Sequence, residues 1–277
     1  MAVFNKRILI LCKTYPSPSA KYSETSCVAG LDEDGALIRL YPIPFRLISD
    51  EQQFKKWQWV TAKVQKSRND HRVESHQLFV DTLSCDGEQL STGNNWQDRR
   101  HYLANIPIFT SFTDIEKARQ ASGVTLALLR PSRIVSLEIK KTENPEWTDE
   151  ELEKLIRLQS QGDLFDQRER RYVTKLRKLP FDFYYHFECI TCDGTELVRK
   201  KIVDWEIGAL YWKLVKSHKD RWEAPFCDKL EKSLPTRDLM FLLGTIHRFP
   251  DQWLIISLIY PPKQQPSQAA QGLLFPE

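Results

Sequence analysis

Apolar residues fall in short runs over the first third of the chain, and polar turn residues separate the runs, which predicts strands. Arg7–Cys12 is an almost continuous apolar run, typical of a buried strand. Two more runs, Val28–Leu31 and Ala36–Tyr41, flank the polar segment Asp32–Gly35. The glycine of that segment supplies the positive φ that a tight turn requires, so the two runs are predicted to form a β-hairpin.

Later segments continue the strand pattern on both sides of a helical middle. Alternation or short apolar runs predict strands at residues 57–65, 77–83, 134–140, 181–189, 196–203 and 253–260. Helical patterning covers residues 96–130 and predicts further helices at 148–160 and 205–219. Thr113 or Asp114 is the expected N-cap of Ile115–Gln120. Asp204 and Glu206 open the last helix, where acids complement the helix dipole.

This order of elements predicts an α+β fold, because strands and helices are segregated rather than alternating. The predicted parts are a β-rich unit that could close into a small barrel (1–95), a helical middle with one strand (96–160), a basic connector (161–180), a second β-rich unit with one helix (181–262) and a flexible tail (263–277).

The composition is that of an ordinary globular protein, with 41% apolar and 28% charged residues. The formal net charge is only +3, so nucleic-acid binding would require local clustering of cations. No apolar run approaches the roughly 18 residues of a membrane span, and the first residues lack the pattern of a signal peptide. The six cysteines do not make a disulfide framework in a chain of 277 residues. We therefore expect a cytoplasmic protein with reduced thiols and no membrane partner.

The last residues contain a candidate docking peptide. The segment Pro261–Gln271 is polar and interrupted by proline, so it is predicted to be disordered. At its end Gln271 is followed by Leu274 and Phe275. This arrangement resembles the peptide by which many bacterial repair and replication proteins bind the sliding clamp (Gln, Leu, Ser or Asp, Leu, Phe), although the two intervening residues depart from it. The resemblance implies recruitment to the clamp or to another protein; the alternative is that the tail folds back on an apolar patch of the same chain.

A second copy of this pattern, Gln161–Phe165, occurs inside the chain and has Asp163 in the third place. It lies at the predicted exit of a helix, where Gly162 suits a C-cap. Leu164 and Phe165 would then anchor the connector to the core. A docking peptide and a core anchor are both open interpretations of this segment.

The connector that follows is strongly basic. Its candidate nucleic-acid residues are Arg168, Arg170, Arg171, Tyr172, Lys175, Arg177 and Lys178. Arginine pairs with phosphate oxygens and an aromatic ring stacks on a base, so this composition suits a nucleic-acid contact. The alternative is an ordinary solvated surface.

Cys189 and Cys192 have the spacing of half a zinc site and are followed by Gly194. Two thiolates on a tight turn grip a metal, but a structural zinc needs four ligands. The residues that could complete the site, none at a standard spacing, are His186, His218, Cys227 and His247. The alternatives are a redox pair and two unremarkable cysteines in a hairpin.

Glu138 and Lys140 are the candidate catalytic pair. They lie two residues apart on a predicted strand and therefore share one of its faces. A carboxylate that binds Mg²⁺ beside a lysine that orients water suits phosphodiester hydrolysis. The pair resembles the acidic-x-Lys signature of restriction-type nucleases. That resemblance implies an earlier Asp, for which Asp114 is the nearest candidate, although a helix-cap role also explains it.

The loop after the first predicted strand is a candidate site for an anionic ligand such as a nucleotide or phosphate. Its hydrogen-bonding residues are Lys13, Tyr15, Lys21, Tyr22 and Glu24. Loops tend to carry function, and the prolines of this one would stiffen it and lower the entropy cost of binding. The alternative is an ordinary loop.

No Walker loop and no GxGxxG, GxSxG or HExxH motif occurs, which excludes ordinary NTPases, dinucleotide enzymes, α/β-hydrolases and zincins. We expect a DNA-associated protein, in repair or in defence against mobile DNA, that is recruited through its tail and contacts nucleic acid through its connector. One alternative is a metal-dependent nuclease that uses Glu138 and Lys140. The other is a protein-interaction subunit without nucleic-acid contact.

Overall fold

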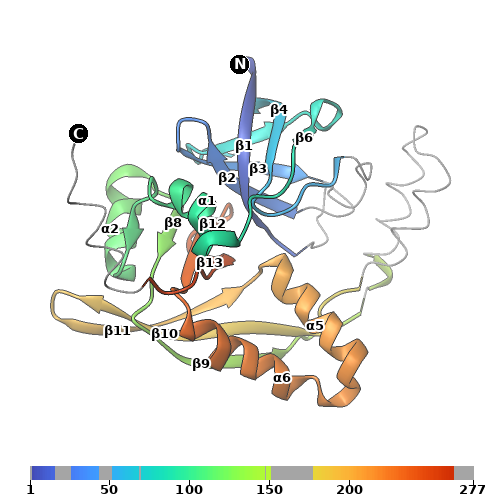
Figure 1. The fold of residues 1–277 in the computed structure, drawn as a ribbon, viewed down its shortest axis with the longest axis vertical. Helices are drawn as coiled ribbons and strands as arrows, with labels where there is room; N and C mark the ends of the chain where they lie inside the picture. The colour runs from blue at the N-terminus through green and yellow to red at the C-terminus, as the bar shows by residue number, and fades with distance from the viewer. Residues whose placement is uncertain are drawn as a thin grey trace.

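A computed structural model describes residues 2–15, 26–43, 52–68, 70–146, 148–150 and 177–264. The segment 161–165 and the tail peptide lie outside these residues, as does nearly all of the helix predicted over 148–160. The described chain forms a barrel followed by a second sheet with its helices (Figure 1). The predicted α+β fold, with a β-rich first unit, helices in the middle and a second sheet, is confirmed.

Five strands of the first unit close into a barrel. They are β1 (Val3–Lys13), β2 (Ser26–Asp32), β3 (Leu37–Ile43), β4 (Trp59–Lys66) and β5 (Ser75–Leu78). Their spatial order is β1-β2-β3-β5-β4, and pairing of β1 with β4 completes the ring. Neighbours in the ring are antiparallel except β3 and β5, which are parallel. A short strand, β6 (Ser84–Asp86), extends the sheet from β4.

The hairpin of β2 and β3 forms where the turn residues predict it. Gly35 has a φ of +78°. The side chain of Asp32 accepts hydrogen bonds from the backbone amides of Asp34 and Ala36 at 3.1 and 2.9 Å. The turn is thus stabilised by its own aspartate, which competes well for backbone donors in such positions.

The wall of the barrel is apolar on two sides. The residues that fill its interior include Ile8, Ile10, Val28, Leu40, Val60 and Val64. On the outer side, Leu9, Leu11, Ala29 and Leu31 are also buried, and they pack against Leu128, Met240, Leu242 and Ile256 of the second unit. The run Arg7–Cys12 is continuous because β1 has a core on each face.

The second sheet has seven strands in the order β7-β8-β12-β13-β11-β10-β9. The strands are β7 (Ile108–Phe109), β8 (Leu126–Leu129), β9 (Arg133–Lys141), β10 (Phe181–Thr191), β11 (Gly194–Ile202), β12 (Met240–Ile246) and β13 (Phe249–Ile259). Two antiparallel groups, β8-β12-β13 and β11-β10-β9, meet at the parallel pair β11 and β13, where Ile202 faces Ile255. The barrel covers the first group.

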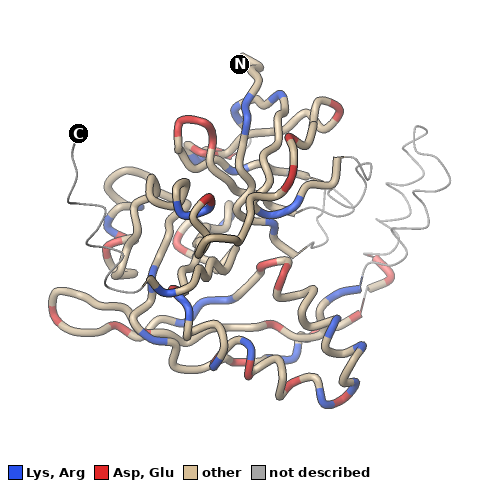
Figure 2. Tube along the Cα trace, in the orientation of Figure 1, with Lys and Arg blue, Asp and Glu red and all other residues tan. Residues whose placement is uncertain are grey.

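Helices cover one face of the second group (Figure 1). Ile207 and Tyr211 of α5 (Trp205–His218) and Phe226 of α6 (Glu223–Cys227) share a core with Phe183 and Tyr185 of β10. No helix in the described part of the chain is long and apolar enough to cross a membrane. Lys and Arg alternate with Asp and Glu over both units, in keeping with the small net charge (Figure 2).

Two details differ from the expectation for the middle of the chain. It contains α1 (Gly93–Leu103) and α2 (Phe112–Ser122), but Leu126–Leu129, expected within the helical part, is the buried strand β8. The N-cap of α2 is neither Thr113 nor Asp114. It is Ser111, whose hydroxyl accepts from the amide of Asp114, so the helix begins slightly earlier than its charges suggest.

Candidate nucleic-acid interface

The barrel has the connectivity of the OB-fold, a five-stranded Greek-key barrel. Ligands of such barrels lie across β2 and β3, between the β1–β2 loop and the β4–β5 loop. Here the second sheet covers the outer face of β2. Arg39 of β3 also donates to the carbonyl of Thr125 at the start of β8, at 2.9 Å. Most of the described β2–β3 face is therefore covered, although Tyr41 of β3 stays exposed.

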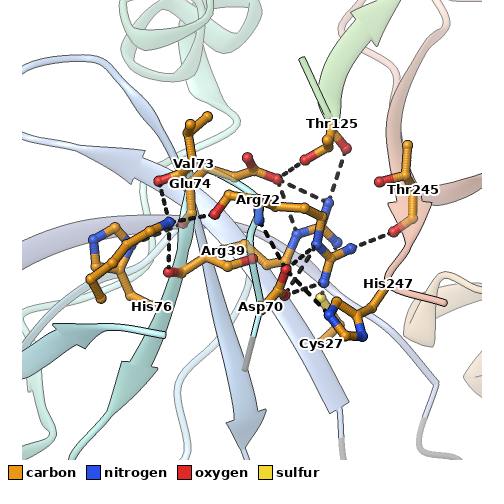
Figure 3. A network of polar contacts seen from close by, with 12 residues as sticks. Cys27, Arg39, Asp70, Arg72, Val73, Glu74, His76, Thr125, Thr245 and His247 are labelled. Atoms are coloured by element: carbon orange, nitrogen blue, oxygen red, sulfur yellow. Dashed lines mark hydrogen bonds and ion pairs between the residues drawn. The ribbon is translucent and has the colours of Figure 1, made fainter. Parts of the chain in front are cut away.

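Arg39 joins the last residues of the β4–β5 loop to the residues that follow the β1–β2 loop (Figure 3). It is only 2% exposed, and its Nε and Nη2 each lie 3.3 Å from Oε1 of Glu74 at the end of the β4–β5 loop. Its Nη1 reaches Sγ of Cys27 at the end of the β1–β2 loop, at 3.5 Å. The hydroxyl of Thr125 donates to the same Glu74 carboxylate. A buried charge is tolerated here because it is paired and hydrogen-bonded on several sides.

Arg72 fixes the outer part of the β4–β5 loop to the second sheet. Its Nε donates to Oδ1 of Asp70 at 2.9 Å, and its Nη1 donates to the carbonyl of Thr245 in β12 at 2.6 Å (Figure 3). Burial disfavours the charge of Asp70, but the bonds from Arg72 outweigh it, so the pKa of the carboxyl lies well below its ordinary value. The loop is held by a charged pair that stays ionised throughout the ordinary pH range.

Tyr15 fixes the first residues of the β1–β2 loop to α5. Its hydroxyl donates to the carbonyl of Arg177 at 2.8 Å and accepts from Nε1 of Trp212 at 2.9 Å. Its ring lies so close to Gly208 of α5 that a Cβ on that residue would be 2.2 Å from Cδ2 of the tyrosine. Only a residue without a side chain fits at this contact.

Lys13 lies between two aromatic rings beside Tyr15. Its Nζ donates to the carbonyl of Phe54 at 3.0 Å and lies 5.2 Å from the ring centroid of Trp205. Burial lowers the pKa of Lys13 to about 8, although the carboxylates of Glu206 and Asp204 oppose the change. The ammonium is still mostly protonated at pH 7, although burial has removed part of its water.

Lys56 of the barrel unit contacts the start of α5 and was not anticipated from the sequence. It is 6% exposed, and its Nζ donates to Oε2 of Glu206 at 3.0 Å and to the carbonyl of Leu258 at 2.7 Å. Asp204, 3% exposed, lies 3.8 Å away and accepts from the amides of Glu206 and Leu258 at 2.8 Å each. The start of α5 is thereby tied to the barrel. Lys55 and Lys56 are adjacent between Phe54 and Trp57, and no sequence pattern tells which of the two lysines is buried.

The structure brings together two sites that the sequence predicts separately. Arg177 is the last arginine of the basic connector, and its guanidinium lies 5.4 Å from the ring centroid of Trp212. The same Trp212 donates a hydrogen bond from Nε1 to the hydroxyl of Tyr15. We call Lys13, Tyr15, Arg177, Trp205 and Trp212 the cation–aromatic cluster. Lys178, the residue after Arg177, donates to the carbonyl of Glu146 at 3.1 Å. The predicted residues outside the described chain are Lys21, Tyr22, Glu24, Arg168, Arg170, Arg171, Tyr172 and Lys175.

Of the predicted catalytic residues, Glu138 and Lys140 share one face of β9, whereas Asp114 lies away from them. Both oxygens of Glu138 accept from Arg199 at 2.8 Å, and Nε2 of His186 lies 2.7 Å away. Hydrogen bonds from Arg199 and then His186 lower the pKa of Glu138 to about 2. Lys140 shares this face and lies opposite Asp182 in the sheet. Asp114 is part of α2, whose first turn donates to the carboxylate of Glu196. Glu196 of β11 pairs with Cys189 of β10, and Glu138 of β9 pairs with Tyr184 of β10. The two glutamates are therefore about five residues, or roughly 17 Å, apart along β10.

The two candidate zinc ligands occupy different environments. Cys189 is fully buried in the core of the second unit, and burial raises its pKa to about 12. Cys192 is exposed in the turn between β10 and β11. Within the described ranges, neither belongs to a group of three or more residues that could hold a metal ion. A buried thiol with a raised pKa is a poor source of the thiolate that zinc requires.

Comparisons with solved structures give distant matches. One match is a chain of a replication protein A heterotrimer bound to single-stranded DNA. It is 9% identical to this chain with a TM-score of 0.27, and the match covers 99% of this chain and 68% of the other. Another is a deletion mutant of the single-stranded DNA binding protein from Thermus aquaticus, 10% identical with a TM-score of 0.21, over 95% and 97% of the two chains. The OB-type connectivity of the barrel is seen in the order and pairing of its own strands.

Two sequence families cover most of the chain between them. Residues 4–105, which include the barrel, match the family described as Domain of unknown function (DUF8758). Residues 108–275 match the family described as Domain of unknown function (DUF8757). No curated protein matches the chain. Because the match to residues 108–275 spans more than half of this chain, the protein belongs to the family described as Domain of unknown function (DUF8757).

Proposed function

We propose that the protein binds single-stranded nucleic acid at the cation–aromatic cluster. The observation that supports this most strongly is the contact of Tyr15, at the start of the β1–β2 loop, with Arg177, at the end of the basic connector. The β1–β2 loop is one of the two ligand-contacting loops of OB-type barrels. Aromatic rings beside cations are how such proteins hold a strand without reading its sequence.

The cluster supplies both interactions that a single strand needs. Lys13 and Arg177 offer charge to phosphates, and Trp205 and Trp212 are only partly buried and offer aromatic surface. Each stacked base contributes about 1–3 kcal/mol. Each neutralised phosphate makes the logarithm of affinity fall with the logarithm of salt by about 0.7 for a single strand. Two cations therefore predict a slope of at least about 1.4 in magnitude.

The test is binding of a fluorescent oligothymidine and a matched duplex, followed by anisotropy across a salt series. Arg177→Glu should weaken single-strand binding by about tenfold and reduce the salt slope, because an exposed cation at the cluster becomes an anion. Lys232→Glu is the matched control, since Lys232 is also exposed but lies beyond α6. Absence of binding at low salt, or equal losses in both variants, would reject the proposal.

We further propose that Gln271, Leu274 and Phe275 recruit the protein to a sliding clamp, in DNA repair or in defence against mobile DNA. The support for this is the resemblance of the sequence to clamp-binding peptides, and these residues lie outside the described chain. Deleting residues 264–277 should abolish capture by a purified clamp while leaving the fold and oligonucleotide binding intact. Unfolding of the truncated protein would instead assign the tail a structural role.

A further inference from the structure

Three side chains that are common metal ligands meet where the β4–β5 loop contacts the β12–β13 hairpin. They are Asp70 and His71 of the loop and His247 of the hairpin. Their ligand atoms all lie within 4.8 Å of one another. Nε2 of His247 is 4.0 Å from Oδ1 of Asp70, and the centroids of the two imidazole rings are 5.6 Å apart. Figure 3 shows His247 beside the carboxylate of Asp70.

We propose that Asp70, His71 and His247 bind a divalent transition-metal ion, zinc or a metal of similar preference, and that the ion joins the barrel to the second sheet. Two imidazoles and one carboxylate form a common set of three protein ligands, with water in the remaining position. Imidazole nitrogen favours zinc, cobalt and nickel over magnesium and calcium, which prefer oxygen. The site is therefore distinct in its chemistry from the magnesium site of a nuclease.

The spacing requires only a small movement of the two histidines. At a metal–ligand distance of about 2.1 Å, the ligand atoms of a tetrahedral site lie roughly 3.4 Å apart. The present separations of up to 4.8 Å exceed this by little more than 1 Å. Both histidines are exposed, so rotation of their side chains can close the difference without moving the buried Asp70.

Arg72 holds the site in place before a metal arrives. It donates to both oxygens of Asp70 and also to the carbonyl of Thr245, two residues before His247. Hydrogen bonds of this kind orient metal-ligating carboxylates and are part of the design of such sites. The guanidinium also repels the incoming cation, so binding should be micromolar rather than the much tighter binding of closed structural zinc sites.

The test is a titration of the untagged full-length protein with Co²⁺ in the presence of a non-thiol reductant. A tetrahedral site of nitrogen and oxygen ligands gives a visible d–d absorption that saturates at one equivalent. His247→Ala and His71→Ala should each weaken binding by at least about tenfold, since each removes a ligand. His101→Ala, which changes an exposed histidine on α1, should leave it unchanged.

A second measurement tests the join between the units. Zn²⁺ should raise the melting temperature of the unmodified protein and slow hydrogen exchange in the β12–β13 hairpin, and neither effect should occur in His247→Gln. Both histidine variants should keep the circular dichroism spectrum of the parent, because the side chain is exposed. Absence of Co²⁺ binding, binding that survives both histidine variants, or an intense near-ultraviolet thiolate band would each overturn the proposal.

Discussion

Replacing Lys56 with methionine tests whether a buried charge pair joins the barrel to the second unit. The substitution keeps the length of the side chain but removes the ammonium from Asp204, which is 3% exposed. Removing one partner of a buried pair costs about 3–5 kcal/mol, because the other charge stays buried without compensation. Glu206 is half exposed, so its ion pair with Lys56 adds little to the loss.

The stability lost in Lys56→Met should be larger at high pH than at low pH. Burial raises the pKa of Asp204, while the ammonium of Lys56 opposes that rise, so Lys56→Met raises the pKa further. A carboxyl whose pKa is higher in the folded than in the unfolded protein favours folding at low pH, and this stability is lost as pH rises through the folded-state pKa. The destabilisation should therefore be largest near pH 8 and smaller near pH 5.

The assay is urea unfolding at both pH values, followed by tryptophan fluorescence and circular dichroism. Lys55→Met is the matched control, because Lys55 is the exposed neighbour and its loss should change the free energy of unfolding by no more than about 0.5 kcal/mol. The double variant with Asp204→Asn should be less destabilised than Lys56→Met alone. A loss below about 1 kcal/mol in Lys56→Met, or an equal loss at both pH values, would refute the reasoning.

Three other substitutions test the cluster and the exposed face of β9. Gly208→Ala gains about 1 kcal/mol of helix propensity but displaces Tyr15 and its two hydrogen bonds, so urea unfolding should show a net loss of roughly 1–3 kcal/mol and anisotropy several-fold weaker single-strand binding. Single-strand affinity should decline between pH 7 and pH 9 as Lys13 deprotonates, and Lys13→Arg should abolish that decline. Glu138→Gln should cost no more than about 1 kcal/mol in urea and leave oligonucleotide binding unchanged. Mg²⁺-dependent cleavage that disappears in Glu138→Gln would instead support the nuclease alternative.

Local patterns in the sequence predicted much of the fold. Asp32–Gly35 specified its hairpin, because the turn chemistry there is local. The unbroken apolar run Arg7–Cys12 also contained the evidence for a second core, since a strand that is apolar on both faces must be covered on both. The strand β12 was missed although Met240–Leu243 is also a continuous apolar run, because periodicity alone does not distinguish such a run from a buried turn of helix.

The candidate interface could be predicted only in parts. Lys13 and Tyr15 stood out as hydrogen-bonding residues of a loop, and Arg177 as part of a basic run. Their meeting depends on a hydrogen bond between residues 162 positions apart, and no local pattern encodes such a contact. The grouping of Asp70 with His247 likewise arises from tertiary packing, and neither residue lies in a metal-binding motif.

The covered outer face of the barrel has a consequence for how the protein is made. The barrel strands are complete at Leu78, but the face formed by Leu9 and Ala29 is fully covered only when β12 and β13 arrive, about 170 residues later. At 5–20 residues per second, the ribosome takes roughly ten seconds or more to supply them. During that interval the nascent chain presents an apolar surface that a chaperone or a neighbouring chain can bind. A fragment ending after α1 would keep that surface permanently, so the two family regions should be expressed as one polypeptide.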